Sequence, residues 1–470
     1  VWTAIKKGLL DVPHLALILA RAWGIVGPHH NFHLDEAGFD WGDAWAAEHD
    51  DEVAAQQRAM AEDAGEPDGF DYISVDGETT RDMDDAFHVR ARGDGWTLRL
   101  ALARPSALWP FGGALDTAVK QRATSLYLPE GDAHMMPEAL ATDLYSLHAG
   151  KVRPALVAEF DIDADGCVAA VRPESGWVRV AANLDFTAAE AAMSGDDAPT
   201  SDAAHHAEHL RLAHALAEAL YARRLADGAV VILKPEPVVE LAGDAADPEV
   251  RVGLKPPCPA AERTVSEFMI LANSALARWA HDQGAALFFR TQDLALPSEA
   301  KGEFSDPVGI YQAVRHLAAA GLEAQPRRHA ALAVDAYAPL SSPIRRYTDL
   351  VNSAQVDALI RTGSPRLDAE ALAALLPLIS HRSQAVGQVQ RFRPRYWKLA
   401  HIQQNKEQPA VLVDDAGPLP TLALPHLQIN LRAPRKILGD KLYPGQAFRL
   451  RFGRVDPVSN EARIVEAFEE

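Results

Sequence analysis

Apolar positions in the first part of the chain recur at helical spacing. DVPHLALILARAW carries apolar residues three and four positions apart, and WGDAWAAEHDDEVAAQQRAMAEDAG continues such a pattern up to Gly65. Pro67, Asp68 and Gly69 then form a turn signal. The pattern therefore predicts a small helical N-terminal domain over residues 1–66.

Alternation of apolar and polar residues takes over from residue 70. DYISV indicates a strand, and AFHVRARGDGWTLRLALA indicates a hairpin that turns at Gly93-Asp94-Gly95. Irregularly alternating strands and helices favour one large mixed α/β domain, which we place at residues 67–406. Its further strands are predicted at 155–162, 168–173, 229–241, 286–290 and 329–338, and its helices at 112–124, 200–226, 260–283, 308–321, 344–361 and 366–406.

The last segment, residues 407–470, contains short strands at regular spacing. Turns such as Pro444-Gly445 separate the strands QPAVLVDD, LPTLALP, INLR, AFRLRFGRVD and EARIVEAF. This pattern predicts a small β-barrel of the OB type, a common module for single-stranded nucleic acid, although another small β-barrel would share it. The three segments predict an α+β multidomain protein, in agreement with a length of 470 residues.

Composition and cysteine usage are those of a globular protein from a reducing compartment. The hydrophobic fraction of 48% is ample for a sizeable core. Cys167 and Cys258 lie far apart without a CxxC pair, which argues against a disulfide scaffold and favours the cytoplasm. The apolar stretch near the start is interrupted by Asp11 and Pro13, and no other run reaches the length of a membrane span. We therefore expect no membrane partner.

A net charge of −19 argues at first against a polyanionic partner, because an acidic protein repels phosphate at long range. However, the acidic residues crowd 34–67 and 190–250, while basic residues gather in RRHA, SPIRRY, QRFRPRYWK and RAPRK. Two interpretations remain open at this point. The chain has a solvated acidic exterior around a basic path, or it is an acidic enzyme with scattered arginines.

A dense group of carboxylates follows the first strand of the central segment. SVDGETTRDMDDAFHV contains Asp76 at the predicted strand end, and then Asp82, Asp84 and Asp85. Like charges this close repel each other, and more strongly as they lose water. Magnesium prefers carboxylate, water and phosphate oxygen, and two such ions stabilise both the attacking and the leaving oxygen of a phosphodiester displacement. The cluster therefore indicates a site for Mg²⁺, with Mn²⁺ as the alternative.

A solvated acidic turn would have the same composition as this cluster. A calcium loop of the EF-hand type fits poorly, because the spacing and the glycine position differ. Apolar residues on both sides, Met83, Ala86 and Phe87, predict that the cluster is part-buried. Because carboxylates are rarely buried without a cation, this context favours the metal site.

A second motif, YAPLSSPIRRYTDLVN, lies far along the chain. The two serines that precede Pro343 predict the N-terminal cap of a helix. Arg345 and Arg346 would then lie in its first turn, where a cation opposes the helix dipole, so that an anionic partner such as phosphate is expected. A structural salt bridge, for instance to Asp349, is the alternative for either arginine.

SVDGETTRDMDDAF and SSPIRRYTDL resemble the two hallmark motifs of the RNase II (RNB) exoribonuclease family. Between them, in the family's order, come LDTAVKQRATSLYLPEG, MPEALATDLYSLHAGKVRPAL and RTVSEFMILAN. The resemblance covers roughly residues 70–400, and five ordered matches are highly specific. It implies a hydrolytic 3′-to-5′ exoribonuclease that degrades single-stranded RNA from a free 3′ end, releases 5′-nucleoside monophosphates and works as a monomer.

The resemblance also implies roles for individual residues. The four aspartates match the family's magnesium-binding and catalytic aspartates, and Arg345 matches the arginine that holds a terminal phosphate. Tyr127, in SLYLPEG, matches the aromatic residue that stacks on the last base, although an ordinary core tyrosine is the alternative. Glu267, in SEFM, matches an acidic residue near the RNA sugar, although a helix-surface charge is the alternative. Arg346 is predicted to contact RNA beside Arg345.

The chain departs from the family at several points. ALAR stands where many members have HIAD, so that Arg104 replaces an aspartate, and Ser353 stands where a histidine is usual. Both changes put substrate contacts in doubt, but neither touches the aspartates. Members usually carry two cold-shock domains in front, which residues 1–66 cannot hold, and we hypothesise a helix-turn-helix-like unit there. Residues 407–470 resemble the family's S1-like OB domain.

Three other functions compete with this interpretation. A non-catalytic RNA-binding protein on a nuclease fold is disfavoured by the intact aspartates. A metal-dependent phosphatase or phosphotransferase is disfavoured by SPIRRY and the OB-like end. Metal binding by His29, His30 and His33 lacks a carboxylate or cysteine partner at clear ligand spacing.

Overall fold

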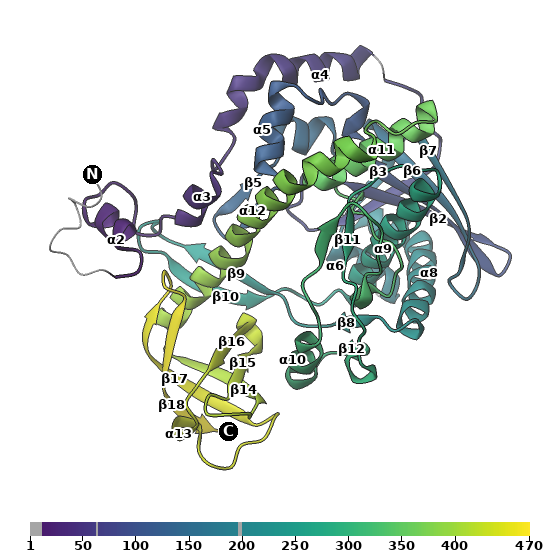
Figure 1. Cartoon of the computed structure of the whole chain (residues 1–470). Helices are drawn as coiled ribbons and strands as arrows, with labels where there is room; N and C mark the ends of the chain where they lie inside the picture. Colours follow the sequence, from purple (N-terminus) through teal and green to yellow (C-terminus); the bar gives the residue numbers. More distant parts are fainter. Residues whose placement is uncertain (1–11, 63, 196–199) are drawn as a thin grey trace.

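The computed structural model describes residues 12–62, 64–195 and 200–470 (Figure 1). The N-terminal part is helical, as predicted, but the second predicted helix is divided into a 3₁₀ turn and an α-helix. Val53 and Met60 of α4 pack in one core with Tyr72 of the first strand, so this helix covers the central part of the protein. The elements are α2 (Leu15–Ala22), α3 (Phe32–Ala37), η1 (Ala44–His49) and α4 (Asp50–Glu62).

A closed five-stranded barrel forms the centre of the molecule, with β1 and β7 paired in parallel and the other neighbours antiparallel. The predicted hairpin is confirmed, and Gly93 turns it with φ 61°. The last strand is much longer than the predicted 168–173. The strands, in order around the barrel, are β1 (Tyr72–Asp76), β2 (Asp85–Arg92), β3 (Gly95–Ala103), β6 (Val152–Ile162) and β7 (Val168–Asp185).

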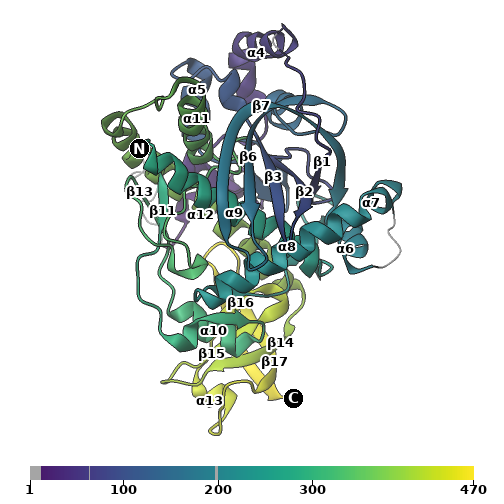
Figure 2. The same ribbon diagram turned by 90° about the vertical axis from the view of Figure 1, so that its right-hand side faces the viewer.

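Both faces of β3, in the barrel wall, are buried. Leu98, Leu100 and Leu102 of β3 pack with one set of helices, whereas Ala101 and Ala103 belong to a second core. The first set contains α6 (Phe186–Ser194), α7 (Ser201–His205), α8 (Ala207–Ala226) and α9 (Pro259–Asp282). The second contains α4, α5 (Ala114–Arg122), α11 (Tyr347–Thr362) and α12 (Ala369–Gln404). Figure 2 shows the barrel strands between α4 at the top and the C-terminal sheet at the bottom.

Short strands and turns connect these elements. The predicted strand at 229–241 is two strands, and the predicted helix at 308–321 ends at Arg315. The short elements are β4 (Leu126–Leu128), β5 (Gly131–Ala133), η3 (Leu140–Leu144), β8 (Val230–Ile232), β9 (Pro237–Ala242), β10 (Glu249–Leu254), β11 (Phe289–Thr291), β12 (Gly302–Phe304), α10 (Pro307–Arg315) and β13 (Gly321–Glu323).

The strand predicted at 329–338 is wrong. The structure has a 3₁₀ turn at Ala330–Leu332, and Ala333 follows with a left-handed backbone, φ 56°. His329 makes only isolated bridges, to Gln292 and Val334, so no ladder forms. The apolar alternation in this segment comes mostly from alanines, which have low β propensity.

The five C-terminal strands are confirmed and form one curled sheet in the order β16-β15-β14-β17-β18. Among the described residues no ladder joins β16 to β18, so hydrogen bonds do not close this sheet into a barrel. Leu399 and Ile402 of α12 enter its core, which anchors the sheet to the end of that helix. No helix in the described part of the chain is long and apolar enough to cross a membrane. The elements are β14 (Glu407–Asp414), β15 (Thr421–Leu424), β16 (Ile429–Arg432), α13 (Arg435–Leu438), β17 (Ala447–Asp456) and β18 (Glu461–Glu469).

Candidate active site

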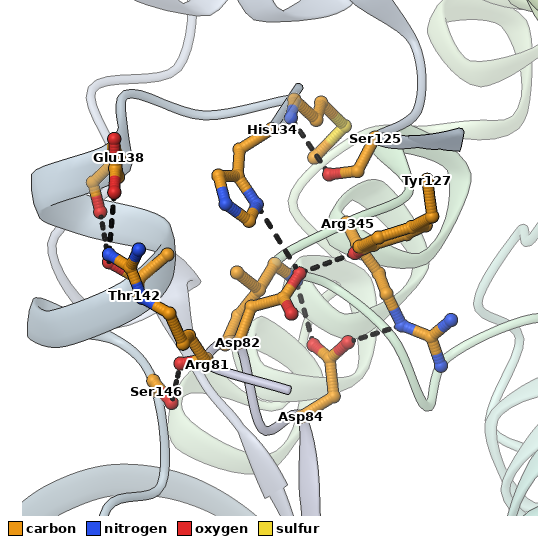
Figure 3. A network of polar contacts seen from close by, with 12 residues as sticks. Arg81, Asp82, Asp84, Ser125, Tyr127, His134, Glu138, Thr142, Ser146 and Arg345 are labelled. Carbon is orange, nitrogen blue, oxygen red and sulfur yellow. Dashed lines mark hydrogen bonds and ion pairs between the residues drawn. The ribbon is translucent and has the colours of Figure 1, made fainter. Parts of the chain in front are cut away.

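The four aspartates gather at one end of the β1–β2 pair. Asp76 is the last residue of β1 and Asp85 the first of β2, while Asp82 and Asp84 lie in the loop between them. Ser146 holds this loop, because its hydroxyl accepts a hydrogen bond from the Met83 amide (3.0 Å) and donates one to the Arg81 carbonyl (2.9 Å; Figure 3). The predicted burial is confirmed, since Asp82 and Asp84 are 5% and 2% exposed.

Asp84 joins the aspartate loop to the SPIR segment. One of its oxygens accepts a hydrogen bond from the Ile344 amide and the other from Nε of Arg345, each at 2.9 Å. Burial would lower the pKa of the Arg345 guanidinium, but Asp84 raises it above its ordinary value. The two motifs, far apart in sequence, therefore meet at one carboxylate (Figure 3).

Asp82 is held by the β4–β5 hairpin. The Tyr127 hydroxyl donates a hydrogen bond to it, and Nδ1 of His134 lies 3.5 Å from it. Burial raises the pKa of Asp82, but the contact with His134 and the hydrogen bond from Tyr127 outweigh burial and the pKa is lowered. The Tyr127 residue remains 39% exposed, which leaves its ring accessible beside the aspartates. Sequence reasoning missed His134, and only the pairing of Leu126 with Ala133 would have placed it beside Tyr127.

The remaining two carboxylates have weaker partners, and at Asp76 the Ser74 side chain and the charge of Arg345 do not outweigh burial. Burial raises the pKa of Asp76 to about 6. Burial and then the charges of Asp76 and Asp84 raise the pKa of Asp85 well above its ordinary value. Burial also raises the pKa of Asp84, to about 7, against the effect of Arg345. Within the described residues no group donates a hydrogen bond to the Asp85 carboxylate, so a second source of positive charge would stabilise this cluster.

The donor set fits a hard divalent cation, because carboxylate oxygens are the ligands that magnesium and manganese prefer. In the portion of the chain that the structure describes, no three His, Cys, Asp or Glu side chains are already arranged as a metal site. The reason is visible in the geometry: Asp82 points to Tyr127 and His134, and Asp84 points to Arg345. Asp76 and Asp85 are the carboxylates that these partners leave available.

The predicted RNA contacts Glu267 and Arg346 both lie in ion pairs. Glu267, on α9, is 3% exposed and makes two bonds to the guanidinium of Arg224, at 2.5 and 2.8 Å. Arg346 donates to Asp349 at 2.7 Å, which is the structural salt bridge that the sequence left open. Contacts of either residue with RNA remain predictions.

The helix start predicted at the SPIR motif is wrong. α11 begins at Tyr347, so Arg345 and Arg346 precede the helix and do not lie in its first turn. No serine side chain caps this helix. Instead, the Asp349 carboxylate accepts hydrogen bonds from the Ser342 amide (3.0 Å) and from Arg346. Asp349 thereby holds the motif in an extended turn that aims Arg345 at Asp84.

Arg104 follows Ala103, whose amide donates to the Asp84 carbonyl (2.7 Å), but the Arg104 side chain has another partner. Arg104 donates to Asp357 of α11 at 2.9 Å, and both residues are buried. Ser175 of β7 also donates to Asp357, at 2.6 Å, so this group ties the barrel to α11. Ser353 is fully buried and its hydroxyl has no hydrogen-bond partner among the described residues. The ion pair of Arg104 with Asp357 therefore has a structural role, between the barrel and α11.

The three N-terminal histidines do not form a metal centre. His29 contacts the Tyr396 hydroxyl at 2.8 Å, while His30 and His33 contact Asp35 and Glu36 at 2.6 and 3.1 Å. Because each ring has a different partner, the histidines do not converge on one point. The structure thus gives no support to this alternative.

The RNB domain model matches residues 69–362. The chain belongs to the RNB family. Among curated relatives of this RNB protein, an uncharacterised ribonuclease of Synechocystis sp. is 29% identical over 404 residues, which cover 84% of this chain and 58% of the relative. Exoribonuclease 2 of Edwardsiella piscicida is 31% identical over 334 residues, 63% of this chain and 50% of the relative. The chain therefore spans about half the length of the curated relatives it matches.

Solved structures share the fold at lower identity. Mycoplasma genitalium RNase R in complex with ribose-methylated single-stranded RNA is 16% identical with a TM-score of 0.77, over 92% of this RNB protein and 77% of that chain. Yeast Ssd1, a pseudonuclease, is also 16% identical, with a TM-score of 0.62 over 84% of this chain and 51% of its own. Since both a nuclease and a pseudonuclease share the fold, activity has to be argued from the site.

Proposed function

We propose that this RNB protein is a hydrolytic 3′-to-5′ exoribonuclease that acts on single-stranded RNA and releases 5′-nucleoside monophosphates. One observation carries the proposal: Arg345 is bonded to Asp84 inside a cluster of four aspartates, with the ring of Tyr127 exposed beside it. A cation, carboxylates and an aromatic face are the groups needed to hold the phosphate, the metal ions and the base of a terminal nucleotide.

Each side chain has a defined task in this proposal. Tyr127 stacks on the terminal base, which tolerates any sequence because every base has a π-face. The planar fork of Arg345 binds the scissile phosphate, and its bond to Asp84 keeps it aimed at the cluster. Arg346 and Glu267 add contacts to the phosphate and the sugar, for which each would have to leave or share its present ion pair.

Divalent cations would be held first by Asp76 and Asp85, with Asp82 and Asp84 completing the set. When bound, two such ions, magnesium or manganese, supply a nucleophilic water and neutralise the charge on the leaving 3′ oxygen. Asp85 is the strongest candidate ligand, because it lacks a hydrogen-bond donor and Asp76 and Asp84 repel it.

The decisive experiment compares the wild type with Asp85→Asn on 5′-labelled RNA, with magnesium, with manganese and with a chelator. We expect stepwise shortening by the wild type with either ion, none with chelator, and a loss of at least about a hundredfold in rate for the variant, as for other single electrostatic groups in active sites. RNA binding by Asp85→Asn should stay largely intact. Normal degradation by Asp85→Asn would contradict the assignment.

The same experiment separates two competing functions. The likeness to a pseudonuclease raises a non-catalytic RNA-binding protein as the second candidate, which would bind labelled RNA without shortening it under any metal condition. A phosphatase would remove the 5′ label and leave the chain length unchanged. The four aspartates favour hydrolysis of the internucleotide bond over both.

We further propose functions for the segments outside the catalytic core. Residues 407–470 serve as an S1-like OB domain for RNA, residues 1–66 as a helical, helix-turn-helix-like domain, and 67–406 as the catalytic domain. The curled five-stranded sheet supports the first assignment. A cytoplasmic monomer is the state we propose, and size-exclusion chromatography with light scattering would test its oligomeric part.

A further inference from the structure

One ring nitrogen of His134 is buried and has no hydrogen-bond partner among the described residues. This atom, Nδ1, lies 3.5 Å from Oδ2 of Asp82, and the His134 side chain is only 10% exposed. Buried polar atoms are nearly always satisfied, so an exception beside a candidate active site needs an explanation. The distance exceeds the usual N–H···O range of about 2.7–3.2 Å, but hydrogen bonds in active sites are often long until the ligands bind.

His134 and Tyr127 meet at the same oxygen of Asp82. The Tyr127 hydroxyl donates to Oδ2, and Nδ1 of His134 faces this oxygen as well. Figure 3 shows both contacts ending at one atom of the Asp82 carboxylate. The two rings lie edge to face, with 6.5 Å between their centroids and an interplanar angle of 78°. Because both contacts fall on Oδ2, neither of them occupies Oδ1.

The backbone around His134 is fixed on both sides of the residue. The guanidinium of Arg122 donates twice to the His134 carbonyl, at 3.0 and 2.9 Å. The amide of the next residue, Met135, donates to Oγ of Ser125 at 2.8 Å. A side chain on so constrained a backbone holds its partner in one geometry. The imidazole therefore has a stable position from which to orient Asp82.

A second histidine has nearly the same surroundings but a different carboxylate. Nδ1 of His49 is also buried without a partner among the described residues, and it lies 3.4 Å from Oε2 of Glu52. The His49 side chain is 11% exposed, and its ring meets Trp45 edge to face at 5.9 Å. Glu52 accepts the amide of Leu115 at 2.8 Å and lies outside the aspartate cluster. What distinguishes His134 is therefore its partner, a candidate ligand of the metal ions.

We propose that His134 is a positioning residue of the nuclease reaction. Nδ1 of His134 and the hydroxyl of Tyr127 together hold Oδ2 of Asp82, and they thereby reserve Oδ1 for a divalent cation. The inference rests on the proposed function and adds to it a residue that acts through Asp82 and not on the RNA. Groups that orient the ligands of a metal ion typically change its affinity by about 10–100-fold.

The first test measures the melting temperature across a magnesium titration, without RNA. His134→Phe keeps a flat ring but has no donor. His134→Asn keeps a donor, because its amide nitrogen is bonded to Cγ as Nδ1 of histidine is. We expect His134→Phe to raise the magnesium concentration for half-maximal stabilisation about tenfold or more, and His134→Asn to stay within about threefold of the wild type.

The second test is kinetic and uses 5′-labelled RNA at the magnesium concentration that half-saturates the wild type. There His134→Phe should lower kcat about fivefold or more, as a tenfold weaker cation site requires, and excess magnesium should restore most of the loss. KM for RNA should change less than about twofold, because His134 does not contact the substrate. A purely structural role would give neither the restoration by magnesium nor this separation of kcat from KM.

His49→Phe is the matched control, because it removes the same kind of contact from a carboxylate outside the cluster. It should keep the magnesium affinity and the kcat of the wild type, whatever its effect on the melting temperature without metal. If His134→Phe also keeps the wild-type magnesium affinity, or if His134→Asn loses as much as His134→Phe, the inference is wrong. His134→Leu, which also lacks a donor, gives the same decision should His134→Phe fold poorly.

The magnesium titration separates failure of the inference from failure of the proposed function. A wild type that magnesium stabilises but that leaves RNA intact would contradict the nuclease assignment, while the His134 variants would still decide the inference. A wild type that hydrolyses RNA, together with a His134→Phe variant of unchanged magnesium affinity, would overturn the inference alone. A wild type that magnesium does not stabilise would also overturn it, because His134 would then have no cation site to support.

Discussion

Each of the four aspartates has a different set of neighbours, and those neighbours decide its protonation. Tyr127 and His134 favour the charged form of Asp82, and Arg345 that of Asp84. At Asp85 the charge of Arg345 is outweighed by burial and by nearby acids, which raise its pKa well above the ordinary value. At the scale of residues, the cluster is therefore a site where protons and divalent cations compete for the same oxygens.

This competition gives a pH dependence whose sign follows from the raised pKa values. Asp76, with a pKa of about 6, and Asp84, with a pKa of about 7, bind protons more strongly folded than unfolded. Between about pH 4 and pH 7 the folded state holds more protons, so these groups lower the free energy of unfolding as pH rises. Stabilisation by magnesium should consequently be small near pH 5 and larger near pH 8.

Thermal melts with and without magnesium at several pH values check this expectation, because the difference between paired melts removes the contribution of other titrating groups. Asp85→Asn should weaken the magnesium effect at the higher pH. An equal magnesium effect at both ends of the pH range would speak against a carboxylate cation site.

Tyr127 combines two contacts that substitutions can separate. Tyr127→Phe keeps the ring but loses the hydrogen bond to Asp82. We expect near-normal RNA affinity and a hydrolysis rate lowered about tenfold, since a bond to a charged group contributes about 1.5–3 kcal/mol. Tyr127→Ala should also weaken binding by about 1–3 kcal/mol, the contribution of one stacked base. Binding and single-turnover hydrolysis measured on both variants test this division, and equal affinity losses would refute it.

At the scale of elements, the β4–β5 hairpin that carries Tyr127 is braced by the N-terminal segment. Arg122 of α5 donates to the carbonyl of Asp40 (2.8 Å) and twice to that of His134 (3.0 and 2.9 Å). Its guanidinium lies over the rings of Phe39 and Trp45, at 4.0 and 4.5 Å from their centroids. Arg122 thereby connects the N-terminal segment to His134, which contacts Asp82.

Arg122→Ala should remove the contacts between the N-terminal segment and the β4–β5 hairpin that pass through this arginine. The loss of three hydrogen bonds and two cation–π contacts is expected to cost about 3 kcal/mol or more. Limited proteolysis should then cut between α3 and α4 at lower protease concentration, and the melting temperature should fall. Arg58→Ala, at an exposed position of α4, is the control and should change neither. Unchanged proteolysis of Arg122→Ala would show that other contacts hold the segment.

At the scale of the whole molecule, the charge distribution matters more than its sum. The net charge is −19, yet Arg391, Arg395 and Lys398 of α12 make no salt bridge among the described residues, whereas Arg393 between them pairs with Glu130. Arginines elsewhere are mostly paired, for example Arg99 with Glu159 and Arg172 with Asp161. This arrangement agrees with a basic path within an acidic exterior.

RNA affinity of the wild type should therefore fall with salt despite the unfavourable net charge. With Arg345 and Arg346 in contact with phosphates, the slope of log affinity against log salt should be about −1.4, from about 0.7 per contact. A fluorescence titration across a salt series gives this slope directly. A slope near zero would mean that stacking, and not phosphate contact, dominates binding.

The sequence by itself determined the elements whose signals are local. Helical periodicity predicted the region of α9, and alternation predicted the β2–β3 hairpin and the C-terminal strands, because spacing along one segment decides each of these. The close spacing of Asp82, Asp84 and Asp85 indicated the candidate site for the same reason. Where the local signal was weak, as in the alanine-rich 329–338, the predicted strand was wrong.

Only the tertiary structure decided which distant groups meet. The contact of Asp84 with Arg345, of Asp82 with His134, and of Glu267 with Arg224 each joins separate segments, and no local periodicity encodes such a meeting. The helix begins only at Tyr347 for the same reason, because the backbone of Arg345 and Tyr347 is hydrogen-bonded to Ser125 and Ala123 of a separate segment. Long-range contacts of this kind depend on how the barrel closes, and closure is a property of the whole chain.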